Sequence, residues 1–328
     1  MEKQRDLYID FLRAFGLIML VVVHTRAPEW LAAFRSFDVP LMVFISALCY
    51  TNRGGYGAYL VKRLKRIYIP VLVFLTLWLA LMNGALIAIG HPPMEFPTII
   101  GSYLLLNQPS IGYVWIMRVF LMMAILSPLY FKWLKNVKFI GLIVVLAIIT
   151  IMQTYLVAGV QSIQSYFPHL IADQFLLYAV GYSLFVVMGI KYKGLSQKQL
   201  LILTLMFAIS VVGFILYNHL DYFKPSEFKY PPEKLYLLYG AFACTLLWYV
   251  KPLFAKVKWP KWVEYLSTNS MWIYLWHIIP VSFIEAMSKF LPYWGERFIV
   301  TLAIAVTLNI IYHKAIRYLP QKIEKLIA

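Results

Sequence analysis

The sequence predicts an all-α polytopic membrane protein with about ten transmembrane helices, and two properties support this fold class. First, 62% of the 328 residues are hydrophobic, 13% are charged and the mean hydropathy is +0.73, whereas a soluble fold of this length needs more polar surface. Second, the basic residues behind the formal charge of +16 separate apolar runs instead of clustering on one face. This distribution favours contact with membrane lipids over binding of nucleic acid.

Ten apolar runs are long enough to cross a bilayer of about 30 Å, which takes roughly 20 helical residues. They lie near residues 7–25, 36–51, 69–90, 112–131, 138–158, 168–190, 199–217, 234–250, 267–288 and 297–314. A shorter apolar piece at 98–106, within the region 91–111, is expected to form a re-entrant or surface helix. The first run is followed by HTRAPEW, which offers no small-residue cleavage site, so we expect it to stay as a span.

Basic residues predict the orientation of these spans. Twenty-one of the 30 Lys and Arg residues fall in the termini and in the alternate connections on the same side. By the positive-inside rule, both termini are therefore expected to be cytoplasmic. With no visible repeat, residues 1–328 are expected to form a single domain in the cell (plasma or inner) membrane.

The first span carries two polar residues that are costly in a membrane, Arg13 and His24. Eleven helical positions place them within about 20° of one face and about 16 Å apart along the axis. One interpretation is a functional site that faces the protein interior or a watery cavity. The structural alternative is that Arg13 reaches the inner headgroups with Asp10 as its i,i+3 partner, while His24 marks the outer interface.

Further polar residues lie in other predicted spans. Arg118 lies within the fourth span, and its permanent charge requires a nearby counterion, for which Asp38, Asp173 or an anionic substrate are the options.

In the ninth span, one helix face is expected to carry the side chains of Ser270, Tyr274 and His277, because their spacing is i, i+4, i+7. Pro280 is expected to kink that helix. Hydrogen bonding between helices is the competing explanation for this polar face.

Two connections and the cysteines complete the set of features. The basic stretch 52–66 is expected to be an inner loop, either a topology determinant or a site for donor phosphates. The stretch 218–235 mixes aromatic, proline and charged residues, and is expected to be an ordered substrate-contacting loop or a plain solvated one. Cys49 and Cys244 fit no metal-ligand spacing, so we predict buried small side chains and no metal site.

Three segments resemble the integral-membrane acyltransferase family 3, particularly its fucose 4-O-acetylase-like branch. The R-x10-H pair of that family corresponds to Arg13 and His24, with Asp10 and Leu12 as its usual lead-in. The family's PLF-F-F-SG segment corresponds to residues 40–47, which include Ser46, and its S-x3-Y-L-x-H element to Ser270, Tyr274, Leu275 and His277. Two departures are Asp38, where the branch often has His, and Ala47, where it usually has Gly.

The resemblance implies a membrane O-acyltransferase that moves an acyl group, usually acetyl from acetyl-CoA, to a hydroxyl of a cell-surface or lipid-linked glycan. No fused extracytoplasmic esterase-like domain and no permanently bound cofactor are expected. His24 is expected to act as general base, since an imidazole has an unperturbed pKa of about 6.5, or to carry the acyl group transiently. Arg13 is expected to bind the donor, and the candidates for other substrate contacts are Asp10, Asp38, Ser46, Arg118, Ser270, Tyr274 and His277.

Two other classes remain open at this stage. A transporter or flippase of a lipid-linked glycan or small polar solute would also have about ten spans and charged residues at mid-depth. A non-catalytic membrane scaffold would tolerate the loss of His24. Acceptor-dependent release of free CoA distinguishes the enzyme from both.

Overall fold

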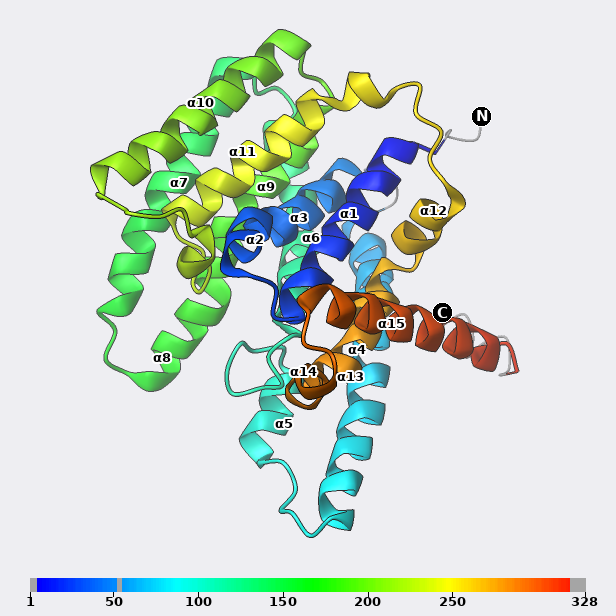
Figure 1. The fold of residues 1–328 in the computed structure, drawn as a ribbon. Coiled ribbons are helices and arrows are strands. Elements are labelled where there is room, and N and C mark those ends of the chain that lie inside the picture. The colour runs from blue at the N-terminus through cyan, green and yellow to red at the C-terminus, as the bar shows by residue number, and fades with distance from the viewer. Residues whose placement is uncertain (1–4, 52–54, 319–328) are drawn as a thin grey trace. The chain divides into compact units, whose positions relative to one another are not determined.

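The computed structural model describes residues 5–51 and 55–318, and within them every regular element is a helix (Figure 1). Eight of these segments are long and apolar enough to cross a membrane. They are Leu7–His24, Glu29–Leu48, Tyr56–Ala88, Trp115–Leu134, Phe139–Gln161, Tyr166–Tyr192, Gln197–Tyr217 and Trp294–Ile316. The protein is therefore a polytopic all-α membrane protein, as the sequence predicts.

The other two predicted spans, 234–250 and 267–288, form shorter helices. Helix α11 (Lys234–Tyr249) has 16 residues and α13 (Ser270–Ser282) has 13, fewer than the roughly 20 that a straight span requires. Most residues of both helices are buried. Their apolar character thus reflects packing inside the protein as well as the membrane setting.

The chain divides into two compact units. The first comprises Met1–Val23, Ala27–Asn52 and Ile125–Thr268. Its helices are α1 (Leu7–His24, up to Val23), α2 (Glu29–Phe34), η1 (Arg35–Phe37), α3 (Asp38–Leu48), the second half of α6 (Trp115–Leu134), α7 (Phe139–Gln161), α8 (Tyr166–Ile171), η2 (Ala172–Leu176), α9 (Leu177–Tyr192), α10 (Gln197–Tyr217), η3 (Pro225–Phe228), α11, η4 (Lys251–Phe254) and α12 (Lys261–Thr268).

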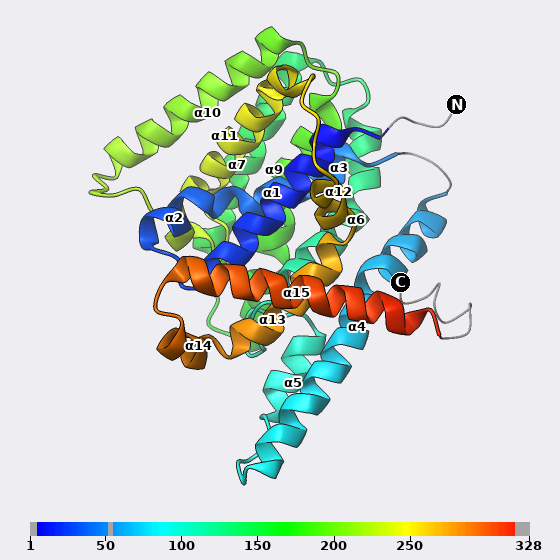
Figure 2. The ribbon, with the colours of Figure 1, turned by 45° about the vertical axis from the view of Figure 1, so that its right-hand side comes forward.

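Close helix packing builds the core of the first unit. Helix α10 runs beside α11, and α3 beside α9 (Figures 1 and 2). A Cβ atom added to Gly189 on α9 would lie 2.5 Å from the Phe44 carbonyl oxygen and 2.6 Å from Ala47 Cβ, so only glycine permits this approach. The buried hydroxyls of Tyr182 and Tyr236 bond each other at 2.8 Å, which satisfies two polar groups inside the core.

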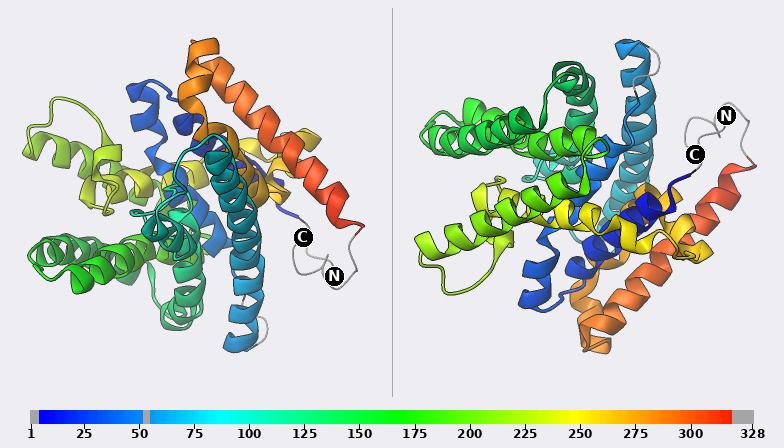
Figure 3. Two further views of the ribbon diagram at one scale, coloured as in Figure 1. Left: turned by 90° about the horizontal axis from the view of Figure 1, so that it is seen from below. Right: turned by 90° about the horizontal axis from the view of Figure 1, so that it is seen from above.

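The second unit comprises His24–Arg26, Arg53–Ala124 and Asn269–Ala328. Its helices are α4 (Tyr56–Ala88), α5 (Phe96–Tyr103), the first half of α6, α13, α14 (Ile284–Phe290) and α15 (Trp294–Ile316). Helix α5 packs on α4, where Tyr68 donates a 3.1 Å hydrogen bond to the Tyr103 carbonyl (Figure 2). Helix α15 packs along α13 (Figure 3).

The structure corrects the predicted inner loop at 52–66. Helix α4 begins at Tyr56, so most of this basic stretch is helical, because its Leu, Lys and Arg residues are strong helix formers. The predicted piece at 98–106 largely coincides with the short helix α5. Of the basic residues used for orientation, Lys3, Arg53, Lys322 and Lys325 lie outside the described residues, and the cytoplasmic placement of the termini stays a prediction.

The connection at 218–235 is ordered and packs on the first unit. Lys224 forms a 2.9 Å ion pair with Glu29, and this contact raises the pKa of the lysine ammonium. Lys229 is only 4% exposed and lies 4.0 Å from Asp38. A buried ammonium requires such a counterion, so the connection is an integral part of this unit.

Candidate active site

Helix α1 runs without interruption from Leu7 to His24 and therefore carries both Arg13 and His24 on one helix, as predicted. The helix is continuous because this segment is apolar and contains no proline. Arg13 belongs to the first compact unit and His24 to the second, so each has its own set of partners.

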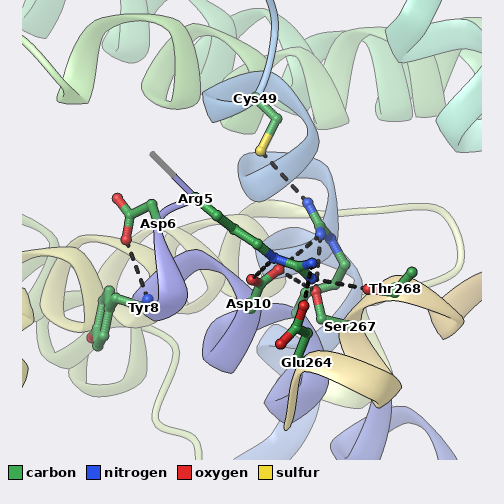
Figure 4. Close-up of polar contacts among 9 residues, drawn as sticks. Arg5, Asp6, Tyr8, Asp10, Cys49, Glu264, Ser267 and Thr268 are labelled. Atoms are coloured by element: carbon green, nitrogen blue, oxygen red, sulfur yellow. Dashed lines mark hydrogen bonds and ion pairs between the residues drawn. The ribbon is translucent and has the colours of Figure 1, made fainter. Parts of the chain in front are cut away.

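Arg13 lies in a group of charged and hydroxyl side chains that we call the Arg13 cluster, made of Arg5, Asp10, Arg13, Glu264, Ser267 and Thr268 (Figure 4). Asp10 is the central acceptor, since Ser267 Oγ donates to its Oδ1 at 2.6 Å and Arg5 donates to its Oδ2. Arg13 Nη1 lies 3.5 Å from Asp10 Oδ1. The i,i+3 ion pair between Asp10 and Arg13, which is part of the structural alternative, is thus present.

Two further contacts hold the Arg13 guanidinium. Nη1 donates to Ser267 Oγ at 2.9 Å, and Nη2 lies 3.5 Å from Cys49 Sγ. The side chain remains 28% exposed, whereas Asp10 and Ser267 are buried. Arg13 is consequently held from one side by buried acceptors, and it faces protein groups within this unit. A guanidinium held in this way can bind an anionic or carbonyl oxygen.

Arg5 ties the cluster to helix α12. Its Nη1 donates to Glu264 Oε1 at 2.7 Å and its Nη2 to Thr268 Oγ1 at 2.9 Å (Figure 4). The Asp10 carboxylate raises the pKa of the Arg5 guanidinium further above its ordinary value. Two arginines and two carboxylates thus balance one another in the cluster.

His24 pairs with His277 in the second unit. His24 Nδ1 lies 2.8 Å from His277 Nε2, and the rings stack with centroids 5.0 Å apart at 15°. The Tyr113 ring meets His24 edge-on, with a centroid distance of 4.8 Å. The Tyr274 hydroxyl donates to the Tyr113 carbonyl oxygen. Helix α13 therefore places both Tyr274 and His277 in the surroundings of His24.

The hydrogen bonds of this pair determine which ring nitrogen of His24 has a lone pair. His277 Nδ1 contacts the Tyr274 carbonyl oxygen, and a carbonyl only accepts, so this nitrogen carries a proton. In a neutral ring, His277 Nε2 is then an acceptor, and His24 Nδ1 must donate to it. For the neutral pair, the lone pair of His24 is therefore on Nε2.

Arg297 fixes the chain directly after His24. This buried arginine donates to the carbonyl oxygens of Thr25 at 3.0 Å and of Leu291 and Pro292 at 2.8 Å each. Arg26 follows with a positive φ of 57°, a conformation that non-glycine residues adopt only where the surroundings require it. Arg297 is not among the site residues that the sequence predicts. Its position in the first turn of an apolar helix was the available signal.

The remaining predicted site residues lie in several surroundings. Asp38 is fully buried and forms an ion pair with Arg35, with Lys229 at 4.0 Å, so it belongs to a buried charge group of the first unit. Ser46 is exposed on α3. Ser270 is the first residue of α13.

Arg118 is buried in the second unit and donates to neutral oxygens. Its Nη1 bonds the Leu105 carbonyl at 2.9 Å, and its Nη2 lies 3.3 Å from Asn107 Oδ1. These contacts anchor the segment that follows α5 to α6. Carbonyl and amide oxygens thus share in stabilising a charge for which sequence analysis had considered only carboxylates or a substrate anion.

Of the two cysteines predicted to be buried, Cys244 is buried and Cys49 is partly buried. Within the described residues, no three His, Cys, Asp or Glu side chains are grouped to hold a metal ion. The functional candidates of this chain are therefore the Arg13 cluster and the histidine pair.

Comparison with known families places the chain in one of them. The model of the acyltransferase domain of the acyltransferase 3 family matches residues 6–313, nearly the whole chain, and includes Arg13, His24 and His277. No curated protein and no solved structure matches the chain. The protein belongs to the acyltransferase 3 family and is a multi-pass membrane acyltransferase, which acts on an acyl donor and an acceptor.

Proposed function

We propose that this protein is an O-acyltransferase that moves an acyl group, most simply acetyl, from acyl-CoA to a hydroxyl of a cell-surface or lipid-linked glycan. His24 is the general base. The observation that carries the proposal is the hydrogen-bonded chain from the Tyr274 carbonyl through His277 to His24. In a neutral His24 this chain leaves the lone pair on Nε2, and a ring nitrogen with a lone pair is what attack by a weakly nucleophilic hydroxyl requires.

In the proposed reaction, His24 Nε2 accepts the hydroxyl proton while the hydroxyl oxygen attacks the thioester carbonyl carbon. The carbonyl electron pair moves onto its oxygen as the new C–O bond forms. The tetrahedral intermediate then collapses with cleavage of the C–S bond, and the thiolate takes the proton from His24. The products are an ester and free CoA, so the step is balanced. A general base of this kind contributes roughly 10²–10⁴-fold to the rate.

His277 is a positioning residue in this scheme. It does not contact the reacting atoms but fixes the tautomer of His24, as a hydrogen-bonded partner does for other histidine bases. Its complete burial supports this role, because a dry site keeps the hydrogen bond intact. Tyr113 further confines the His24 ring from its edge.

Arg13 is proposed to bind the acyl donor. Its partly exposed guanidinium is suited to bind phosphate or carbonyl oxygens, and the buried Asp10 and Ser267 orient it. By the positive-inside rule, the end of α1 nearer to Arg13 faces the cytoplasm, where acyl-CoA is available. We propose the cell membrane as the location, with the acceptor on the outer side.

The test is acceptor-dependent release of CoA thiol by the purified protein in lipid nanodiscs. His24→Ala is expected to abolish release at normal abundance, whereas His91→Ala, which removes an exposed histidine, should leave it unchanged. Arg13→Ala is expected to raise the KM for the donor. Retained transfer by His24→Ala refutes the base assignment, and movement of a glycan without thiol release would instead identify a transporter. Mass spectrometry of the surface glycan then identifies the acyl group and acceptor.

A further inference from the structure

A cavity of about 520 Å³ lies at one end of the helix bundle of the first unit. It is lined by the residues that precede and begin α1, by the end of α9, the start of α10, the end of α11 and the segment 251–259. This volume is in the range of small-molecule sites, which is about 300–1,000 Å³. None of the residues of the proposed catalytic pair lines it.

Basic side chains dominate the charge of this cavity. Arg5, Lys193 and Lys251 line it, and the only acidic lining residue among those described is Asp6. Lys251 Nζ lies 2.5 Å from Asp6 Oδ2 and 4.5 Å from the centre of the Trp248 ring, so its ammonium is held over an aromatic face. The three cations come from three separate parts of the chain, which are the segment before α1, the connection between α9 and α10, and η4. Three cations against one carboxylate give the lining a positive formal charge, which favours an anionic ligand. Arg5 shares its charge with Asp10 and Glu264 of the Arg13 cluster, and Lys251 shares its charge with Asp6.

The same cavity has an aromatic wall. The ring of Phe254 lies 5.4 Å from that of Tyr8 and 5.9 Å from that of Trp259, centroid to centroid, and all three residues line the cavity. Phe11 stacks on Trp259 at 4.2 Å and so holds the indole in place. Planar aromatic side chains are the usual surfaces on which nucleobases stack. A ligand with both a planar base and phosphates thus matches this cavity.

We propose that this cavity binds the nucleotide end of the acyl-CoA donor, with the adenine on the aromatic wall and the phosphates at Lys193 and Lys251. The inference rests on the proposed function for the identity of the nucleotide. Arg5 connects the cavity to the Arg13 cluster, since it lines the cavity and also donates to Asp10. The cavity and the Arg13 cluster are therefore adjoining parts of the first unit.

Two other assignments compete with this one. The basic turns of α4, with Lys62 and Lys65, are the part of the sequence that suggests donor phosphates, but they belong to the second unit and do not line this cavity. An anionic lipid headgroup also carries phosphate. It has no planar base, however, and would leave the wall of Tyr8, Phe254 and Trp259 without a function.

The experiment measures binding of adenosine 3′,5′-bisphosphate to the purified full chain in nanodiscs of zwitterionic lipid. Lys251→Ala and Lys193→Ala are each expected to weaken binding roughly tenfold, the usual effect of removing one charged hydrogen bond. Lys256→Ala is the matched control, because it removes an exposed lysine of the same connection that does not line the cavity. Lys251→Arg keeps the charge and is expected to bind within about threefold of the wild type.

Acyl transfer provides a second readout that separates the nucleotide site from the reaction itself. With acetyl-CoA, Lys251→Ala should raise the donor KM about tenfold with kcat unchanged. With acetyl-pantetheine, which has no nucleotide, it should behave as the wild type. Trp259→Phe should keep binding and Trp259→Ala should weaken it, and inorganic pyrophosphate should bind far more weakly than the nucleotide.

Several results overturn the inference. They are absence of nucleotide binding by the wild type, equal binding by wild type and Lys251→Ala, equal losses in Lys251→Ala and Lys256→Ala, or a loss confined to Lys65→Ala on α4. Displacement of the nucleotide by phosphatidylglycerol but not by CoA would assign the cavity to lipid. If the nucleotide binds as expected but no acceptor-dependent CoA release occurs, the cavity assignment stands and the proposed reaction falls.

Discussion

Replacing Asp10 with Asn tests whether this carboxylate holds the Arg13 cluster together. Both carboxylate oxygens of Asp10 accept, Oδ1 from Ser267 and, at 3.5 Å, Arg13, and Oδ2 from Arg5. An amide keeps the shape but turns one oxygen into a donor. Asn must therefore direct an NH2 group at Ser267 or at an arginine, and two guanidinium groups lose their shared counterion.

The expected loss of stability follows from the burial of each partner. The bond from the buried Ser267 to a charged acceptor is worth about 1.5 kcal/mol. Arg5 is 45% exposed and Arg13 28% exposed, so solvent screening reduces each ion pair to about 0.5–1 kcal/mol. Together these give about 3 kcal/mol, which corresponds to a fall in the apparent melting temperature of roughly 6–12 °C.

The assay is thermal unfolding of the purified variants in identical nanodiscs, followed by tryptophan fluorescence. Glu264→Gln is the matched control, since it makes the same chemical change on a residue that pairs with the exposed Arg5 and is itself 53% exposed. It should melt within about 2 °C of the wild type. If Asp10→Asn and Glu264→Gln have the same melting temperature, Asp10 is not the central acceptor and the reasoning fails. A donor KM that is raised in Asp10→Asn and restored in Asp10→Glu would link the cluster to donor binding by Arg13.

Three further predictions concern the histidine pair and the helix packing. His277→Ala should lower kcat roughly 10- to 100-fold, less than the loss of the base itself, with the acceptor KM unchanged. His277→Gln retains an acceptor atom and should recover part of the rate. An unchanged kcat in His277→Ala contradicts the positioning role. Gly189→Ala should lower the free energy of unfolding by about 1–3 kcal/mol, because its Cβ meets the Phe44 carbonyl oxygen. Gly213→Ala on α10, where a Cβ meets nothing within 4 Å, should be neutral or stabilising. Equal melting temperatures of the two variants disprove the close approach. Arg297→Lys should lower the free energy of unfolding by about 1–3 kcal/mol, because a single ammonium cannot reach the carbonyls of Thr25, Leu291 and Pro292 together. A melting temperature equal to that of the wild type argues against the anchoring role of Arg297.

The helices could be predicted from the sequence because each one needs only local information. Apolar runs and the absence of internal breakers indicate where α7, α10 and α15 lie. The start of α4 was placed too late, because a search for apolar residues stops at the basic turns between Tyr56 and Arg66, although these residues form helix well. The lengths of α11 and α13 were also missed, since a buried helix inside a protein is as apolar as a membrane span.

The partners of the polar residues could not be predicted, because they depend on distant parts of the chain. Arg13 and Ser267 are 254 positions apart, and His24 and His277 are 253 apart. The spacing of Tyr274 and His277 indicated one helix face, but nothing in it identified His24 as the group opposite. Arg118 shows a second reason. A search for its counterion considers carboxylates, whereas backbone oxygens such as that of Leu105 exist at every position and leave no sequence signal.

The two candidate groups are stabilised by different physics, and this difference determines which substitutions are informative in each. In the Arg13 cluster, charges of opposite sign are paired, so a substitution that keeps size but removes charge, such as Asp10→Asn, disturbs it most. In the histidine pair, the geometry depends on which nitrogen carries a proton, and the final acceptor is a neutral carbonyl that no side-chain substitution removes. A change at His277 therefore acts on the tautomer of His24 rather than on a net charge. We accordingly expect added salt to weaken the effects at the exposed edge of the Arg13 cluster while leaving the kcat loss of His277→Ala unchanged.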